Sequence, residues 1–270
     1  MQKTILITGS TDGIGLEAAK TFAEKGHHIL LHGRDENKLK LSEKLVAENG
    51  DASKIETYLA DLSDLNDVKK MAQAIANKHS SLDVLINNAG VFKTPTTITK
   101  NGLDIRFAVN TLAPFYLTQA LLPLMKPRSR VVNLSSAAQR SVELSALKGD
   151  IQLPDDVEAY AQSKLAITMW TNTLAEKHKQ TGPIFVSVNP GSLLATKMVQ
   201  EGFGMPGNDI NIGRDILVRA ALSEDFEHAN GKYFDNDMGQ FADPHTDALD
   251  IKTCANITTV IEETIQQLVF

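Results

Sequence analysis

Short apolar runs alternate with stretches of helical periodicity along this chain, and that alternation restricts the fold more than any other feature. The apolar runs predict strands at residues 5–8, 28–32, 55–59, 82–86, 130–134, 184–188 and 232–234. The stretches between them predict helices at residues 13–25, 36–49, 65–79, 103–125, 158–179, 209–222 and 257–268. Alternating strands and helices build a mostly parallel sheet with helices on both faces, and strands buried in this way are apolar throughout. We therefore predict an α/β protein with a doubly wound sheet.

The composition is that of one globular domain. The 270 residues are 42% hydrophobic and 22% charged, with no repeat, low-complexity tract or compositional break that would mark a linker. We expect a single domain over residues 1–270. The net charge of -6 includes no basic stripe or lysine-rich tail, which argues against nucleic acid as a partner.

Three further features indicate the compartment. The single cysteine, Cys254, excludes an internal disulfide and fits a reducing environment. The start at Met1 lacks the apolar region and cleavage site of a signal peptide, and no apolar run is long enough for a membrane span. We expect a cytoplasmic protein, and we predict no metal site.

A glycine-rich turn, Thr-Gly-Ser-Thr-Asp-Gly-Ile-Gly at residues 8–15, joins the first predicted strand to the first predicted helix. Glycines allow a tight turn and a close approach of backbone to ligand, and a helix N-terminus offers free N–H groups to a pyrophosphate. We predict dinucleotide contacts at Gly9, Ser10, Gly13, Ile14 and Gly15, with a plain tight connection as the alternative. The turn lacks the Lys-Ser/Thr ending of a triphosphate-binding loop, which argues against phosphoryl transfer.

The end of the second predicted strand, His32-Gly33-Arg34, bears on the choice of cofactor. A dinucleotide site that prefers NAD usually has a carboxylate here to bind the ribose hydroxyls, and Gly33 provides none. The guanidinium of Arg34 suits a 2′-phosphate. We predict NADP, with NAD as the alternative, because Asp12 occupies a place where a basic residue would favour NADP.

Tyr160 and Lys164 lie four residues apart in the predicted helix 158–179, so their side chains point the same way. A phenol with its ordinary pKa near ~10 is a poor base at neutral pH. A neighbouring ammonium should lower the pKa of Tyr160 and let it exchange a proton with an alcohol or carbonyl oxygen. Taken alone, the spacing also fits a core aromatic residue beside a solvated lysine.

The motifs occur together in one order over roughly residues 3–200. After the glycine-rich turn come Asp61, then Asn87-Asn88-Ala89-Gly90, Asn110, Ser136, Tyr160-x-x-x-Lys164 and Pro190-Gly191 with a nearby threonine. In this order the chain resembles the classical short-chain dehydrogenase/reductase family, which has a Rossmann-type fold. The resemblance implies an oxidoreductase that transfers a hydride between NADP(H) and a carbonyl or an alcohol.

The resemblance also implies roles for individual residues. Tyr160 would donate the proton, Ser136 would bind the substrate oxygen, and Lys164 would bind the nicotinamide ribose while Asn110 holds a water. Cofactor contacts would come from residues at the strand ends: Asp61 and Leu62 at the adenine, Asn88, Ala89 and Gly90 at the ribose, and Pro190, Gly191 and Thr196 at the nicotinamide. Relatives often pair through helices near 103–125 and 160–178, so a homodimer or homotetramer is open.

Two segments depart from the family pattern. The stretch 137–159 is longer than usual and resembles that of the retinol-dehydrogenase-like group. The nicotinamide-side motif carries one residue more than the commonest spacing before Thr196. Residues 193–210 combine glycines with Met198, Phe203 and Met205, which suits a mobile lid over an apolar substrate, although a plain surface connection has the same composition.

Two other functions remain open from the sequence. A cofactor-binding regulator or scaffold without catalysis could lose Tyr160 or Lys164 freely, whereas both are present. A sugar epimerase or dehydratase of the extended type would have a longer chain and a differently spaced glycine turn.

Overall fold

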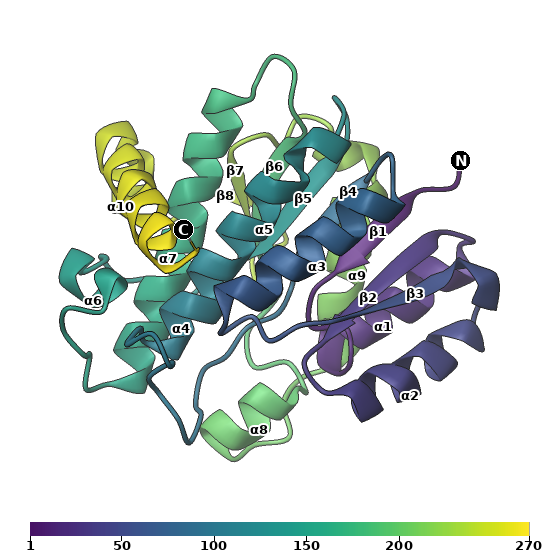
Figure 1. Ribbon diagram of the computed structural model, residues 1–270, viewed down its shortest axis with the longest axis horizontal. Coiled ribbons are helices and arrows are strands. Elements are labelled where there is room, and N and C mark those ends of the chain that lie inside the picture. The colour runs from purple at the N-terminus through teal and green to yellow at the C-terminus, as the bar shows by residue number, and fades with distance from the viewer. Residues whose placement is uncertain (270) are drawn as a thin grey trace.

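Eight strands form one sheet in the computed structural model, which describes residues 1–269 apart from the side chain of Phe203. The strand order is β3-β2-β1-β4-β5-β6-β7-β8, and only the β7–β8 pair is antiparallel (Figure 1). The strands are β1 (Thr4–Ile7), β2 (His28–Gly33), β3 (Ile55–Leu59), β4 (Val84–Asn87), β5 (Arg130–Leu134), β6 (Ile184–Asn189), β7 (Lys232–Asp235) and β8 (Gln240–Ala242). The predicted doubly wound, mostly parallel sheet is therefore confirmed, and the order reverses between β1 and β4, where such sheets bind ligands.

Helices cover both faces of this sheet. They are α1 (Gly13–Glu24), α2 (Glu36–Ala47), α3 (Leu65–Lys78), α4 (Ile105–Phe107), α5 (Ala113–Leu121), α6 (Leu144–Lys148), α7 (Asp156–Lys177), α8 (Lys197–Phe203), α9 (Ile210–Leu222) and α10 (Ile251–Val269). Side chains alternate along each strand, so Ile5 and Ile7 pack toward α1, α2 and α9, while Leu6 packs toward α3, α5 and α7.

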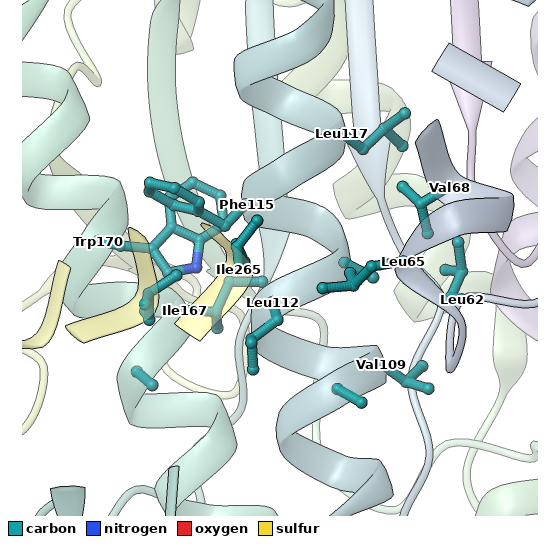
Figure 2. Close-up of a cluster of buried hydrophobic side chains, with 14 of the residues drawn as sticks. Leu62, Leu65, Val68, Val109, Leu112, Phe115, Leu117, Ile167, Trp170 and Ile265 are labelled. Atoms are coloured by element: carbon teal, nitrogen blue, oxygen red, sulfur yellow. The ribbon is translucent and has the colours of Figure 1, made fainter. Parts of the chain in front are cut away.

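The core on the α3 side is built from several helices that lie side by side. Figure 2 shows Leu65 and Val68 of α3 on one side of it and Trp170 of α7 on the other. The rings of Phe115 and Trp170 meet edge to face, with centroids 5.5 Å apart. This packing fixes α7, which carries the predicted Tyr160–Lys164 pair.

The C-terminal helix α10 packs along α7 on the outside of this layer (Figure 1). It begins at Ile251, earlier than the predicted 257, because its first turn is too poor in buried apolar residues to show the periodicity. Its buried side chains include Ile257, Val260 and Ile261. Within residues 1–269 no helix is long and apolar enough to cross a membrane.

The predicted helix 103–125 is interrupted. A π-helical turn, Ala108–Leu112, separates α4 from α5, and the segment ends in a 3₁₀ turn, Leu122–Leu124. Pro114 lies in the first turn of α5, where its missing N–H costs nothing. The π turn places Asn110 at its centre, and such turns are frequent at functional sites.

Candidate active site

The glycine-rich turn passes from β1 into α1 with a backbone that residues other than glycine rarely adopt. Gly9 and Gly13 have φ values of 64° and 59°. A Cβ atom on Gly9 would lie 2.9 Å from the Cα of Ala89, and one on Gly15 would lie 2.4 Å from Nδ2 of Asn88. The glycines thus permit both the turn and its close contact with the segment after β4.

Asn88 fastens that segment to the turn. Its Nδ2 donates to the carbonyl oxygens of Thr8 and Gly9, at 2.8 and 3.0 Å. The Thr8 hydroxyl oxygen accepts from the N–H groups of Asn88 and Ala89. The predicted cofactor residues 9–15 and 88–90 therefore lie together at the carboxyl ends of β1 and β4.

His32 also holds the turn, a role that no motif in the sequence indicates. The Gly9 N–H donates to Nδ1 of His32 at 3.0 Å, so Nε2 carries the proton that is donated to the Ala60 carbonyl, at 3.1 Å. Burial lowers the pKa of His32 to about 4, so the ring is neutral at physiological pH. Its position beside Gly33 at a strand end was the only available signal in the sequence.

The residues predicted around the adenosine half lie at the ends of β2 and β3. Arg34 directly follows β2 and is exposed. Asp61 follows β3, and its Oδ1 accepts from the N–H and hydroxyl groups of Ser63 at 2.9 and 2.8 Å. The Leu62 side chain points into the core cluster, where Figure 2 shows it near Val68.

Asp12 has a local role that its sequence position did not reveal. It is the N-cap of α1, and its Oδ1 accepts from the Gly13 N–H at 2.7 Å. Caps of this kind satisfy an N–H group that the helix leaves free. The carboxylate is exposed at the same helix N-terminus that would face the cofactor phosphates.

Tyr160 and Lys164 project from one face of α7, as the four-residue spacing predicts. The Lys164 Nζ lies 5.7 Å from the Tyr160 ring centroid and donates to the carbonyl oxygen of Leu134 at 2.7 Å. Burial lowers the pKa of Lys164 to about 8. The lysine is thus buried at the end of β5 with a pKa near the physiological range.

The predicted fall in the pKa of Tyr160 is wrong for the protein without its cofactor. Burial raises the pKa of Tyr160, and the nearby Ser136 hydroxyl opposes that change only in part. The physical reason is that a buried phenolate loses its hydration, while Lys164 directs its hydrogen bond to Leu134. The Tyr160 ring also packs against Phe92, with centroids 5.2 Å apart.

Two adjacent serines follow β5, and their surroundings distinguish them. The buried Ser135 hydroxyl lies within hydrogen-bond distance of the Lys164 carbonyl, at 3.0 Å, and of the Thr168 hydroxyl, at 2.7 Å. Ser136 is partly exposed, and its Oγ accepts from the Ala138 N–H at 3.1 Å. Ser135 therefore has structural contacts, whereas Ser136 is accessible beside Tyr160.

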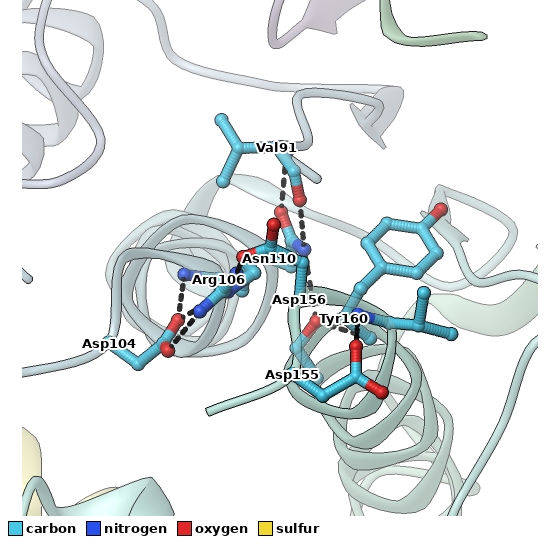
Figure 3. A network of polar contacts seen from close by, with 9 residues as sticks. Val91, Asp104, Arg106, Asn110, Asp155, Asp156 and Tyr160 are labelled. Atoms are coloured by element: carbon cyan, nitrogen blue, oxygen red, sulfur yellow. Dashed lines mark hydrogen bonds and ion pairs between the residues drawn. The ribbon is translucent and has the colours of Figure 1, made fainter. Parts of the chain in front are cut away.

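Asn110 lies between the segment after β4 and α7, as Figure 3 shows. Its Oδ1 accepts from the Val91 N–H at 2.8 Å, and its Nδ2 donates to the Val91 carbonyl and the Ser163 hydroxyl, both at 3.0 Å. A Cβ atom on Gly90 would lie 3.4 Å from Nζ of Lys164 and 3.5 Å from Oδ1 of Asn110. The structure thus brings Gly90, Asn110 and Lys164 together.

A buried ion pair anchors the start of α7. Arg106 is 1% exposed and forms two contacts with Asp104, at 2.8 and 2.5 Å, and a further one with Asp156 (Figure 3). Asp156 begins α7, one turn before Tyr160. The pair therefore connects α4 to the helix end that carries the tyrosine.

The segment after β6 closes the site from the other side. Pro190 and Gly191 follow the strand, and Thr196 is the N-cap of α8, with its hydroxyl oxygen accepting from the Val199 N–H at 3.3 Å. A Cβ atom on Gly13 would lie 3.6 Å from the Cγ2 atom of Thr196, so the extra residue in the motif still leaves this threonine beside the glycine-rich turn.

The predicted lid, residues 193–210, is tied at its base and contains α8. Leu194 and Asn208 form a bridge, and the Ala195 N–H donates to the Asn208 carbonyl at 2.7 Å. A Cβ atom on Gly202 would lie 2.8 Å from the Phe92 ring, which itself contacts Tyr160. The predicted role of Phe203 depends on a side chain outside the described part of the structure.

The hairpin of β7 and β8 supports two of these loops, and no sequence motif indicated it. The Tyr233 hydroxyl donates to the Ser136 carbonyl at 3.1 Å. In the hairpin turn, Asn236 Nδ2 donates to the Pro190 carbonyl at 3.0 Å, and Asp237 accepts from the N–H and hydroxyl groups of Ser192 at 2.8 and 2.6 Å. These side chains of the hairpin therefore hydrogen-bond to the loops that follow β5 and β6.

This arrangement defines a dinucleotide-dependent oxidoreductase of the α/β class. The family model for the short chain dehydrogenases matches residues 3–205, so the chain belongs to that family. Similar proteins include retinol dehydrogenase 11 of Homo sapiens, 34% identical over 86% of this chain and 76% of that protein, and the chloroplastic short-chain dehydrogenase TIC 32 A of Brassica napus, 31% identical over 86% and 79%. The predicted retinol-dehydrogenase-like subgroup is thereby confirmed.

Solved structures agree with this assignment. A short-chain dehydrogenase from Escherichia coli CFT073, complexed with NADPH, superposes with a TM-score of 0.71 at 29% identity, over 87% of this chain and 96% of that one. An uncharacterised protein from Mycobacterium paratuberculosis gives a TM-score of 0.81 at 25% identity, over 98% of this chain and 94% of that one.

Proposed function

We propose that this protein transfers a hydride between NADP(H) and a carbonyl or alcohol substrate, with Asn110, Ser136, Tyr160 and Lys164 as its catalytic group. One observation carries the proposal: these side chains, from three separate segments, meet at the carboxyl ends of the central strands, beside the glycine-rich turn. The relatives that are named retinol dehydrogenases support an alcohol or carbonyl substrate.

The residues present fit a dinucleotide. Close contacts at Gly9 and Gly15 leave no room for side chains at the turn, and the first turn of α1 offers N–H groups to phosphates. The cradle would consist of Gly9, Ser10, Gly13, Ile14, Gly15, Arg34, Asp61, Leu62, Asn88, Ala89, Gly90, Tyr160, Lys164, Pro190, Gly191 and Thr196. The structure in complex with NADPH supports NADP as the form used. When bound, this cofactor supplies or accepts the hydride.

The protein's own groups handle the oxygen and the proton. Ser136 and Tyr160 donate hydrogen bonds to the substrate oxygen, on which negative charge develops as a carbonyl is reduced. Tyr160 then gives up its phenolic proton to that oxygen. A raised pKa for Tyr160 keeps the phenol protonated until that step, and a charged Lys164 stabilises the phenolate that remains.

The single domain of residues 1–270 includes a lid over the proposed active site. Residues 193–210 form the lid, since α8 packs against Phe92, and the Phe92 ring also contacts Tyr160. Covering the site excludes water and strengthens electrostatic interactions inside it. The side chains of this lid would select apolar substrates, consistent with the relatives' names.

Replacing Tyr160 with phenylalanine tests the proposal. We expect turnover to fall by about a hundredfold to ten-thousandfold, the usual contribution of a general acid, with cofactor affinity nearly unchanged. The measurements are NADPH consumption across aldehydes, ketones, quinones and retinoids, and a binding titration with NADPH. Tyr116→Phe, a partly buried tyrosine on α5, is the matched control.

The same experiment separates catalysis from the alternative of a binding protein. Near-normal turnover in Tyr160→Phe would remove Tyr160 from the chemistry. Binding of NADPH without consumption of any carbonyl substrate by the wild-type protein would favour a regulator or scaffold.

A further inference from the structure

A second cluster of chemically active side chains lies at the opposite ends of the strands, away from the proposed active site. His28 begins β2, Glu56 is in β3, and His79 follows the last turn of α3. One potential ligand atom from each residue, a ring nitrogen or a carboxylate oxygen, lies within 4.8 Å of the other two. We propose that these three residues bind Zn²⁺, and this proposal is independent of the proposed function.

The spacing of the three groups matches what one ion requires. Nε2 of His28 lies 3.0 Å from Oε1 of Glu56, and Nε2 of His79 lies 3.2 Å from Oε2. With zinc–ligand distances of about 2.0–2.2 Å, ligand atoms on a tetrahedron are separated by roughly 3.3 Å. The ligand atoms are thus already near the required spacing, and an ion would displace the contacts that Lys78 makes with Glu56 and Tyr58 makes with His79.

The orientation of the rings agrees as well. Two imidazoles that bind one tetrahedral zinc through Nε2 place their ring centroids about 5 Å apart, given a zinc–nitrogen distance of about 2.0–2.1 Å. The centroids of His28 and His79 are 5.4 Å apart, and both rings direct Nε2 toward Glu56. Two histidines, one carboxylate and an open fourth position are a usual zinc donor set.

The carboxylate of Glu56 already faces hydrogen-bond donors and a cation. His28, His79, Tyr58 and Lys78 each place a nitrogen or oxygen atom within 3.2 Å of its oxygens. The Tyr58 hydroxyl donates to Glu56 at 2.9 Å and so orients the carboxylate, as outer partners of metal ligands do.

Lys78 is the competitor for the carboxylate. Its Nζ lies 2.9 Å from Oε2 of Glu56, but its side chain is 61% exposed and can turn into solvent when an ion binds. This competition predicts the direction of a change in zinc affinity. Removal of Lys78 should strengthen zinc binding, although it removes a cation–carboxylate contact. A cluster that serves only as a hydrogen-bond network would show no such gain.

The experiment is calorimetric titration of untagged protein with Zn²⁺ at neutral pH, with thermal unfolding in parallel. We expect one ion per chain and a higher unfolding temperature with zinc, because the ion would join β2, β3 and α3. His79→Gln should lower the affinity by at least about a hundredfold, since even outer partners of metal ligands are worth about ten- to a hundredfold. His228→Gln, at an exposed histidine, is the matched control and should bind as the wild type does.

Lys78→Ala completes the design, with an expected gain of about two- to fivefold, the value of an exposed ion pair. Equal binding by the wild type and His79→Gln would overturn the proposal, and so would weaker binding by Lys78→Ala. The unfolding temperatures without zinc verify that each variant is folded. Spacings of 28 and 23 residues between the ligands explain why no sequence motif revealed the cluster.

Discussion

Residues 3–205, which match the family model, and the remaining residues up to 269 contribute to the site in different ways. The first region places side chains such as Tyr160 and Asn110 at the ends of the central strands. The second region places Tyr233, Asn236 and Asp237 behind the loops, where they hold backbone and side-chain groups of Ser136, Pro190 and Ser192. Residues proposed to act on the substrate are therefore recognisable by type and spacing, whereas residues that hold the loops are recognisable only by their contacts.

The largest effect expected within this comparison concerns cofactor choice, which the first region should determine alone. Arg34→Asp should reverse a preference for NADPH over NADH. A charge-assisted hydrogen bond to a phosphate is worth about 1.5–3 kcal/mol, or roughly one to two decades of affinity. The carboxylate would also repel the phosphate and accept from the hydroxyls of NAD. The measurement is kcat/KM with each cofactor and one carbonyl substrate.

Lys44→Asp, an equal charge change at an exposed position near the end of α2, controls for long-range electrostatics and should leave the ratio unchanged. A wild-type preference for NADH would show that Arg34 is a surface residue. The carboxylate of Asp12 at the N-terminus of α1 would then be the group that disfavours NADP.

The second prediction concerns the free-energy cost of burying the charge of Lys164 in the first region. Burial lowers the pKa of Lys164 from 10.5 to about 8, which corresponds to a cost of about 3 kcal/mol for keeping the charge in the folded state at neutral pH. Lys164→Met removes that cost but also the hydrogen bond from the charged ammonium to Leu134, worth about 1.5–3 kcal/mol. We expect an unfolding free energy up to about 1.5 kcal/mol higher at pH 7, measured by urea denaturation of cofactor-free protein.

The sign of the pH dependence follows from the two pKa values. Below pH 8 the lysine is charged in both states and the folded state bears the whole cost, whereas above pH 10.5 it is neutral in both and the cost vanishes. The advantage of Lys164→Met should therefore shrink between pH 8 and 10.5. Lys177→Met, at an exposed end of the same helix, should show no such trend. A methionine variant less stable than wild type at pH 7 would contradict the prediction.

Most of the sheet could be predicted from the sequence, because buried parallel strands are apolar runs. The antiparallel strand β8 and the short helix α6 were not predicted, since elements of three and five residues contain too few positions to show a period. The π turn at Asn110 was also missed, because it arises from contacts with Val91 and Ser163 rather than from a local propensity.

The candidate site divides in the same way. Ser136 was chosen over Ser135 from the family pattern, and the contacts of Ser135 with Lys164 and Thr168 provide the physical reason. The structural role of His32 could not be predicted, because it depends on a hydrogen bond from the Gly9 N–H across the turn. Nothing local in the sequence determines which distant backbone group a buried side chain will reach.

The smallest expected effect tests whether the region after residue 205 contributes to catalysis at all. Tyr233 is 6% exposed, and its hydroxyl holds the Ser136 carbonyl, which also accepts from Gln139 at 2.9 Å. Tyr233→Phe deletes one hydrogen bond of about 0.5–1.5 kcal/mol, so kcat should fall about two- to tenfold. The KM for NADPH and the pH profile should stay unchanged, because the Tyr233 hydroxyl bonds to Ser136, which lies outside the proposed cofactor cradle. Asp237→Asn, which weakens the hold on Ser192 next to the nicotinamide-side loop, should instead raise the KM for NADPH. If the two variants change different kinetic constants, the hairpin supports the two loops separately. An unchanged kcat in Tyr233→Phe would show that the hydrogen bond from this tyrosine does not contribute to catalysis.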